Sequence, residues 1–129
     1  MAAHNDLGKL GEELAVDFLE KAGYEILETN WTFQKAEIDI IAKKDTVLAV
    51  VEVKTRSSLL FGLPQDFVNS KKIQLLIKAI DAYVNSKELD LEVRFDIIAI
   101  NTDGKKSSEG ENKEKSFVIE HLIDAFYHF

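Results

Sequence analysis

Two carboxylates and a lysine lie in the first half of the chain at a spacing that suits chemistry. Glu52 and Lys54 follow the apolar run TVLAVV, and Asp39 lies in the preceding segment AEIDIIA. Carboxylate oxygens are the ligands that Mg²⁺ takes in proteins, usually one or two of them together with substrate phosphates. A lysine beside such an ion stabilises charge that develops on a phosphate. These residue types therefore suit metal-assisted hydrolysis of a phosphodiester.

The two segments must be neighbouring strands for these side chains to meet. Residues 36–42 and 46–54 are apolar and β-branched, and only a short polar turn separates them. This pattern predicts an antiparallel hairpin. A two-residue turn after Lys44 sets a register in which Asp39 stands directly opposite Glu52. We therefore expect the carboxylates to converge at the ends of two paired strands.

Side-chain alternation along the two strands adds a third carboxylate. Glu37 is expected to share a face with Asp39, and Lys54 to share a face with Glu52, because residues two apart point the same way. Carboxylates opposed across strands repel one another. Either a bound divalent cation or an ion pair with Lys54 relieves that cost. A strand that ends in E-x-K is common, so the spacing alone leaves both interpretations open.

A helix opens the chain and precedes the first strand. Asn5 or Asp6 is expected to cap it, and Gly23 is expected to end it just after Ala22. Residues 24–33 contain aromatic and β-branched types and are expected to form the strand that follows. The helix residues that we expect to face the core, from their spacing, are Leu7, Leu10, Leu14, Phe18 and Ala22.

A second amphipathic helix, expected over about residues 71–85, separates the hairpin from a fourth strand at 91–100. Arg94 and Asp96 share a face of that strand and are expected to form a structural ion pair. Residues 101–116 are polar and predict a mobile surface loop before a short fifth strand and a closing helical turn. The apolar face of the second helix is predicted to consist of Ile73, Leu76, Ile77, Ile80 and Val84.

The order of these elements predicts one α/β domain over residues 1–129. A helix between two strands acts as a crossover, so the central sheet should be mixed and flanked by helices. The chain has no Cys, which excludes disulfides and thiolate metal sites. It has no apolar run long enough to span a bilayer and no secretory signal, so the expected location is the cytoplasm.

Charge is distributed unevenly along the chain. The net charge of −7 argues against indiscriminate binding to a polyanion. Residues 53–80 nevertheless hold five basic residues and one acidic residue. Lys71 and Lys72 fall in the first turn of the second helix, where cations oppose the helix dipole unless an anion binds there. This indicates a localised anion site, with a solvated helix face as the alternative.

Taken together, the motifs resemble a known family. Asp39 followed by Glu52-x-Lys54, in a helix–strand–strand–strand–helix–strand order, is similar to the PD-(D/E)xK motif of the restriction-endonuclease-like superfamily, which includes archaeal Holliday-junction resolvases. From about residue 8 to residue 126 the chain resembles the YraN-like family of small bacterial proteins. It departs from that family's pattern at Ala36, where Gly is common, and in VNSKK, which lacks the usual proline. The segments that carry the resemblance are GEELAVDFLEKAGYEILETN, EIDIIA, VVEVKTR, FG, RFDIIAI and IDAF.

The resemblance implies roles for five residues at the carboxylate site. Asp39 and Glu52 would be ligands of Mg²⁺ or Mn²⁺, and Lys54 would be the catalytic lysine. Glu12, in the GE of the first helix, would be a supporting acid that faces the metal. Glu37 would be a further carboxylate in or beside the ligand set.

The resemblance also implies a substrate. Arg56 and Lys72 would face the phosphates of a nucleic acid, with DNA, in particular branched or damaged DNA, as the expected substrate. Lys71 is expected to join them because of its place in the first turn of the second helix. The implied function is that of a metal-dependent nuclease. The alternative is a nuclease-like fold without catalysis that binds nucleic acid or protein, which the net charge favours. The apolar tail HLIDAFYHF is a third consideration, since it suits a protein contact or a homodimer as well as the core.

Overall fold

The structure, a computed structural model, describes residues 3–56, 70–102 and 117–125 of the 129-residue chain. Two helices and five strands follow one another in the predicted order. They are α1 (Ala3–Lys21), β1 (Glu25–Phe33), β2 (Ala36–Lys44), β3 (Val47–Arg56), α2 (Ser70–Lys87), β4 (Glu92–Thr102) and β5 (Phe117–Leu122).

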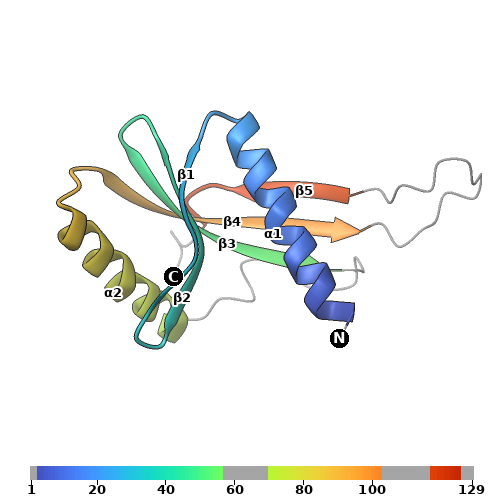
Figure 1. Ribbon diagram of the computed structural model, residues 1–129, viewed down its shortest axis with the longest axis horizontal. Helices are drawn as coiled ribbons and strands as arrows, with labels where there is room; N and C mark the ends of the chain where they lie inside the picture. The colour runs from blue at the N-terminus through green and yellow to red at the C-terminus, as the bar shows by residue number, and fades with distance from the viewer. Residues whose placement is uncertain (1–2, 57–69, 103–116, 126–129) are drawn as a thin grey trace, which may run out of the picture.

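The five strands form one mixed sheet in the order β1-β2-β3-β4-β5. β3 and β4 are parallel, with α2 as the crossover between them, and the other three pairs are antiparallel. Figure 1 shows α1 crossing in front of the central strands and α2 lying beside β2. The predicted α/β class, with a mixed sheet flanked by helices, is therefore confirmed.

The hairpin of β2 and β3 has the register predicted from the sequence. Lys44 pairs with Val47, and the paired residues continue to Ile40 and Val51. Asp45 occupies the turn with a φ of 56°, a left-handed conformation that Asp tolerates well. The short polar turn thus sets the alignment of the two strands.

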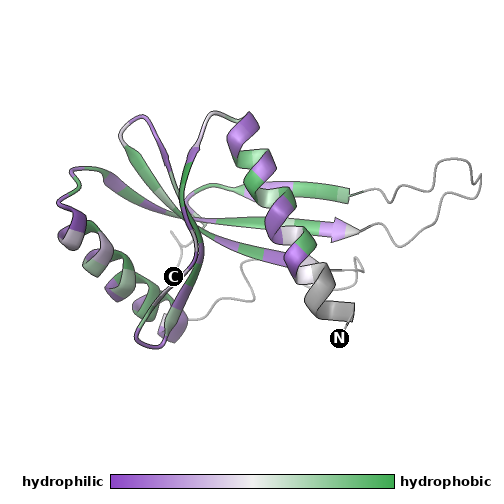
Figure 2. Ribbon diagram, viewed as in Figure 1, coloured by the Kyte–Doolittle hydropathy of each residue, from purple (hydrophilic) through white to green (hydrophobic). Residues whose placement is uncertain are grey.

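Alternate residues of the central strands enter two separate cores. Leu48 and Val50 of β3 pack on the α2 side, whereas Ala49 and Val51 pack on the α1 side. Figure 2 shows hydrophobic stretches along the central strands and both helices banded with hydrophilic and hydrophobic residues. β3 is therefore buried on both faces, which explains its nearly continuous apolar sequence.

The ends of α1 agree only in part with the prediction. The helix begins at Ala3, so Asn5 and Asp6 lie within it and do not cap it. Its C-terminus is as expected, because Gly23 adopts a φ of 99° after the last helical residue. The amide of Tyr24 donates a hydrogen bond back to the carbonyl of Leu19, which closes the end of the helix.

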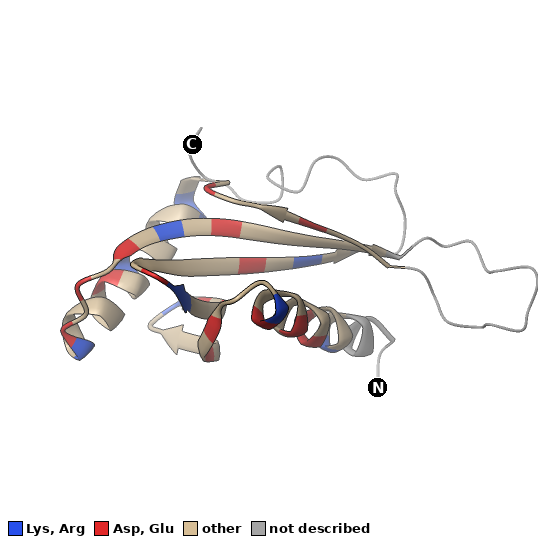
Figure 3. Cartoon of the chain, turned by 90° about the horizontal axis from the view of Figure 1, so that it is seen from above, with Lys and Arg blue, Asp and Glu red and all other residues tan. Residues whose placement is uncertain are grey.

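The core-facing side of α1 differs from the predicted one. Ala15 and Leu19 are fully buried, whereas Leu10 is 38% exposed. A Cβ placed on Gly11 would lie 2.0 Å from Oγ1 of Thr55, so α1 approaches β3 closely at this glycine. Figure 3 shows acidic residues along α1, of which Glu13, Asp17 and Glu20 are exposed. Gly11 and Ala15 are small, so a search for large apolar residues overlooks them, whereas the predicted Leu14 and Phe18 do pack partly against this core.

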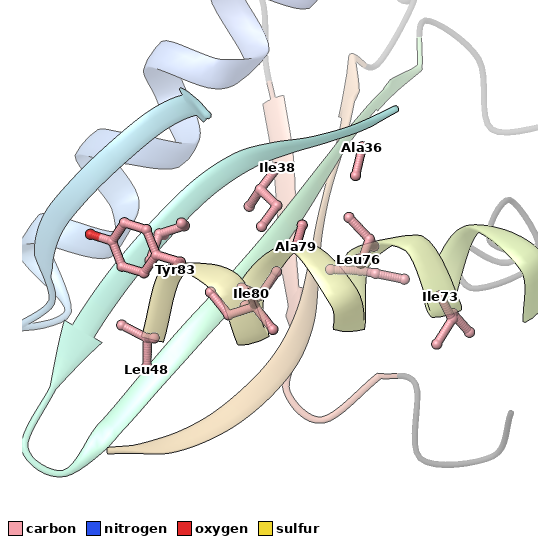
Figure 4. Packing of buried hydrophobic residues seen from close by; sticks show 11 residues of the cluster. Ala36, Ile38, Leu48, Ile73, Leu76, Ala79, Ile80 and Tyr83 are labelled. Atoms are coloured by element: carbon pink, nitrogen blue, oxygen red, sulfur yellow. The ribbon is translucent and has the colours of Figure 1, made fainter. Parts of the chain in front are cut away.

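α2 packs on the opposite face of the sheet (Figure 4). The predicted core positions Ile73, Leu76 and Ile80 are buried, but Ile77 is 47% exposed. The buried face continues instead through Ala79 and Tyr83.

Several predicted segments lie partly or wholly outside the described residues. Of the loop predicted at 101–116, only Asn101 and Thr102 are described, and they extend β4. β5 is followed by a turn at 123–125, where a closing helical turn was expected. No helix in the described part of the chain is long and apolar enough to span a membrane.

Candidate functional site

Asp39 lies where the pairing of β2 with β3 ends. The last paired residues are Ile40 and Val51, so the pairing stops one residue short of Asp39 and Glu52, which the sequence predicted to stand opposite each other. Oδ2 of Asp39 accepts a hydrogen bond of 2.8 Å from the backbone amide of Val53. The side chain thus takes the place of a strand carbonyl, which fixes its carboxylate between the ends of the two strands.

The side-chain alternation of β2 is interrupted at the same place. Ile38 packs in the α2 core, yet Ile40, two residues later, packs in the α1 core. On β1, Asn30 stands opposite Asp39 and has a left-handed φ of 51°. The prediction that Glu37 and Asp39 share a face assumed that side chains alternate regularly along β2. The alternation is interrupted between Ile38 and Ile40, so that assumption does not hold here.

Glu52 is buried, and one of its carboxylate oxygens pairs with the ammonium groups of two lysines. Its Oε2 lies 2.6 Å from Nζ of Lys72 and 3.3 Å from Nζ of Lys54. Glu52 continues the face of β3 that packs on α2, so the first turn of α2 brings Lys72 onto it. The close pair of Glu52 and Lys54 agrees with the predicted shared face.

The pKa of Asp39 is raised from 3.8 to about 7. Burial is the largest cause, and the negative charge of Glu52 adds to it. The amide of Val53 and the cation of Lys72 act in the opposite direction, and Glu12 raises the pKa further. The electrostatic environment therefore disfavours an ionised Asp39, and an added cation would relieve that cost.

Glu12 reaches this site from α1. Its charge contributes to the raised pKa of Asp39, and its Oε1 accepts a hydrogen bond of 3.3 Å from Nδ2 of Asn30. The close approach of α1 at Gly11 and Thr55 turns this part of the helix toward the sheet. The structure thus brings Glu12 near Asp39, although the helical periodicity alone favoured a boundary position.

The remaining predicted residues lie to one side of the carboxylate pair. Glu37 is exposed and, with Lys71 and Lys72, lines a cavity of about 340 Å³ between β2 and α2. Glu37 is not among the groups whose charge acts on Asp39. The backbone of Arg56 ends β3, but its side chain lies outside the described part of the structure.

Asp39 and Glu52 are the protein oxygens that fit a hard cation at this place. The described residues contain no group of three or more His, Asp or Glu side chains suited to holding a metal. A Mg²⁺ site usually takes one or two carboxylates and completes its shell with water and substrate phosphates. The pair therefore suits a cation shared with a substrate better than a closed structural metal site.

A second charged cluster, away from these carboxylates, holds β4 and β5 together. Arg94 donates to both oxygens of the fully buried Asp96, as the sequence predicted, and also to the Tyr24 hydroxyl. Nε2 of His121 and the amide of Asp124 complete the shell of Asp96 at 2.8 Å and 3.0 Å. Burial raises the pKa of Asp96, but these hydrogen bonds outweigh it and hold the pKa below its usual value. The cluster is fully satisfied, which favours a structural role.

His121 had no recognisable role in the sequence. Three scattered histidines show no metal spacing, and only the pairing of β5 with β4, which sets His121 beside Ile98, brings it to Asp96. The local sequence indicated only that Arg94 and Asp96 share a strand face, which identifies two residues of the cluster but not His121.

Comparison with known proteins gives a family match over most of the chain. The model of the uncharacterised protein family UPF0102 matches residues 11–100. A UPF0102 protein of Flavobacterium psychrophilum is 64% identical over 129 residues, which cover both chains completely. A UPF0102 protein of Flavobacterium johnsoniae is 60% identical over 133 residues, again with full coverage of both chains. One of Bacteroides thetaiotaomicron is 45% identical over 127 residues, or 98% of this chain and 97% of its own.

Proposed function

The chain belongs to the UPF0102 family, and on that premise we propose that it is a metal-dependent nuclease of the restriction-endonuclease-like type. One observation carries the proposal. Asp39 lies just beyond the last pair of β2 and β3, and burial together with the nearby charge of Glu52 raises the pKa of Asp39 to about 7. Strongly perturbed carboxyl groups of this kind cluster at functional sites.

The two carboxylates would hold the cation, Mg²⁺ or Mn²⁺, because hard cations prefer oxygen ligands and relieve the repulsion between these groups. When bound, the cation polarises a phosphate and lowers the pKa of a coordinated water. The amide of Val53 fixes Asp39 in position. Lys54 keeps its ammonium 3.3 Å from Glu52, where it can stabilise negative charge on the attacked phosphate.

The substrate that fits this arrangement is a phosphodiester in nucleic acid, for which DNA is our proposal. Lys71 and Lys72 start α2 beside the carboxylates and present the cations that a phosphate backbone needs. The acidic residues along α1 (Figure 3) would repel a polyanion from the other face of the sheet. Contact is therefore proposed on the α2 side, by a local surface and not by the whole molecule.

A second function, binding of nucleic acid or protein without cleavage, has a specific observation in its favour. Lys54 and Lys72 both pair with Oε2 of Glu52, so the protein's own side chains neutralise this carboxylate. A site whose negative charge is already neutralised has less need of a cation. The net charge of −7 also suits a protein with limited contact to DNA.

Cleavage assays separate the two functions. Purified protein is incubated with end-labelled linear, flapped and four-way-junction DNA, with and without Mn²⁺. The nuclease proposal expects cleavage of at least one substrate that requires Mn²⁺ and is lost in Lys54→Ala. Cleavage that Lys54→Ala retains points to a contaminating enzyme. Binding without cleavage of any substrate supports the second function.

A further inference from the structure

The cavity between β2 and α2 has features of a ligand site in its own right. Lys35, from the turn between β1 and β2, borders it on one side, and Lys71, from the first turn of α2, borders it on the other. Within the described part of the chain neither lysine forms an ion pair. Two lysines from different elements thus line the same cavity.

The start of α2 adds to this positive potential. The first turn of the helix contains Lys71 and Lys72 and no acidic residue. The exposed amides of a helix N-terminus carry a partial positive charge, so lysines here are unfavourable unless an anion is bound. Among the described residues that line the cavity, Glu37 is the one carboxylate, and it leaves these residues with a net positive charge. The cavity is therefore suited to an anion that carries one or two negative charges.

The floor of the cavity is apolar. Ala36 and Leu76 are buried members of the α2 core, and Leu75 packs partly against the same core. The volume of about 340 Å³ is at the lower end of the range for small-molecule sites, about 300–1,000 Å³. An inorganic ion alone would leave this floor unused, whereas a ligand with a flat apolar part would cover it.

We propose that this cavity binds a nucleoside monophosphate unit, with the phosphate between Lys35 and Lys71 and the base on the floor of Leu75 and Leu76. A phosphomonoester carries a charge of about −1.5 to −2 at neutral pH, which suits the net charge of the lining. Glu37, at the rim, offers an acceptor to an amino or hydroxyl group of the nucleoside. It also disfavours a polyphosphate, because it would repel the additional charge.

The position of Lys72 connects this cavity to the carboxylate site. Lys72 lines the cavity, and its Nζ lies 2.6 Å from Oε2 of Glu52. A nucleotide held here would therefore lie next to the phosphate that the proposed nuclease attacks. On the premise of that function, the preferred substrate is a strand whose phosphorylated end enters the cavity.

Nucleotide binding is tested without metal, so that the result does not depend on cleavage. Backbone amide shifts of ¹⁵N-labelled protein in EDTA are followed during titration with 2′-deoxyadenosine 5′-monophosphate, 2′-deoxyadenosine or inorganic phosphate. We expect the monophosphate to shift the amides of residues 35–37 and 71–76 and to bind more tightly than either fragment. The double variant Lys35→Ala/Lys71→Ala should bind it about fivefold or more weakly. Lys78→Ala, an exposed lysine of α2 outside the cavity, should bind it as the wild type does.

Two results would overturn this proposal. One is equal binding of the nucleoside and its monophosphate, since the lysines would then have no role. The other is equal binding of inorganic phosphate and the monophosphate, since the apolar floor would then have none. A pair of short oligonucleotides, with and without a 5′-phosphate, identifies the source of the ligand. Preference for the phosphorylated strand assigns a strand end, and equal binding of both strands assigns a free nucleotide.

The outcome is independent of the carboxylate site. A protein that binds Mn²⁺ but no nucleotide in EDTA retains the proposed nuclease function and loses this inference. A protein that binds the nucleotide but no Mn²⁺ retains this inference and loses the nuclease function.

Discussion

Asp39 accepts a hydrogen bond of 2.8 Å from the backbone amide of Val53, across the point where the pairing of β2 with β3 ends. This single contact fixes a carboxylate that its surroundings would prefer to keep uncharged. Burial and the charge of Glu52 raise the pKa of Asp39 to about 7, although the hydrogen bond lowers it. A side chain held in a position that is unfavourable for its own charge is typical of a functional site.

The free-energy cost of ionising Asp39 in the folded protein should make the stability depend on pH. The pKa of Asp39 is higher in the folded protein, about 7, than its ordinary value of 3.8. Its contribution to stability is therefore fully present below pH 4 and is lost as the pH rises through 7. Asp39→Asn removes the ionisation and can still accept the hydrogen bond from Val53. Without metal at pH 8, we expect this variant to be more stable than the wild type by roughly 1–3 kcal/mol.

Urea denaturation in EDTA at pH 5 and pH 8 measures this difference. The advantage of Asp39→Asn should shrink at pH 5, where the wild-type carboxyl group is mostly protonated. Asp17→Asn, at an exposed position of α1, is the matched control and should show no comparable change between the two pH values. An Asp39→Asn variant less stable than the wild type at pH 8 contradicts the assigned electrostatics.

The ion pair of Lys72 with Glu52 should contribute to stability in the absence of metal. Glu52 is buried and Lys72 is partly exposed, so we expect Lys72→Met to cost about 1 kcal/mol. Lys71→Met, one residue earlier and without an ion pair in the described residues, should cost little. A double-mutant cycle of Lys72→Met with Glu52→Gln measures the coupling by chemical denaturation. A coupling energy of zero would show that the pair does not persist in solution.

The close contact of α1 with β3 predicts opposite effects for two glycines of the same helix. In Gly11→Ala the new Cβ would lie 2.0 Å from Oγ1 of Thr55, so we expect a loss of about 1–3 kcal/mol. No atom of the described residues lies within 4 Å of such a Cβ on Gly8, so Gly8→Ala should stabilise the helix by about 0.5–1 kcal/mol. Thermal and chemical unfolding check both values. Equal effects of the two substitutions would contradict the observed packing of α1.

The buried Asp96 should be the most sensitive charged residue for folding. Asp96→Ala leaves the guanidinium of Arg94 without its partner, which costs about 3–5 kcal/mol for a buried pair. The pKa of Asp96 is lowered in the folded protein, so its contribution is present above about pH 4 and is lost in acid. Asp90→Ala, at an exposed position before β4, is the control. Denaturation of both variants at pH 7 and pH 3 tests the prediction, which fails if Asp96→Ala unfolds like the control.

Local patterns were sufficient to predict the hairpin and most of the α2 core. The register of β2 and β3 from Lys44–Val47 to Ile40–Val51 follows from one short turn and a period of two. The fine geometry of Asp39 could not be predicted. It depends on the left-handed Asn30 in a neighbouring strand and on the interrupted alternation of β2.

The face of α1 was predicted only in part: Leu14 and Phe18 pack partly against the core, whereas Leu10 is 38% exposed. Periodicity weights large apolar residues, whereas this helix packs closely through Gly11 and Ala15. Because the predicted face was centred on the large apolar residues, the helical projection placed Glu12 away from the site. The role of His121 was missed because it depends on a pairing between β4 and β5, and no local pattern records such a pairing.

Calorimetric titration of Mn²⁺ into the metal-free protein tests the central claim most directly, because it requires no knowledge of the substrate. We predict that the wild type binds one Mn²⁺, that Asp39→Ala and Glu52→Gln lose this binding, and that Glu37→Gln retains it. A wild type that binds no Mn²⁺, or an Asp39→Ala variant that binds it equally well, would contradict the proposed metal site.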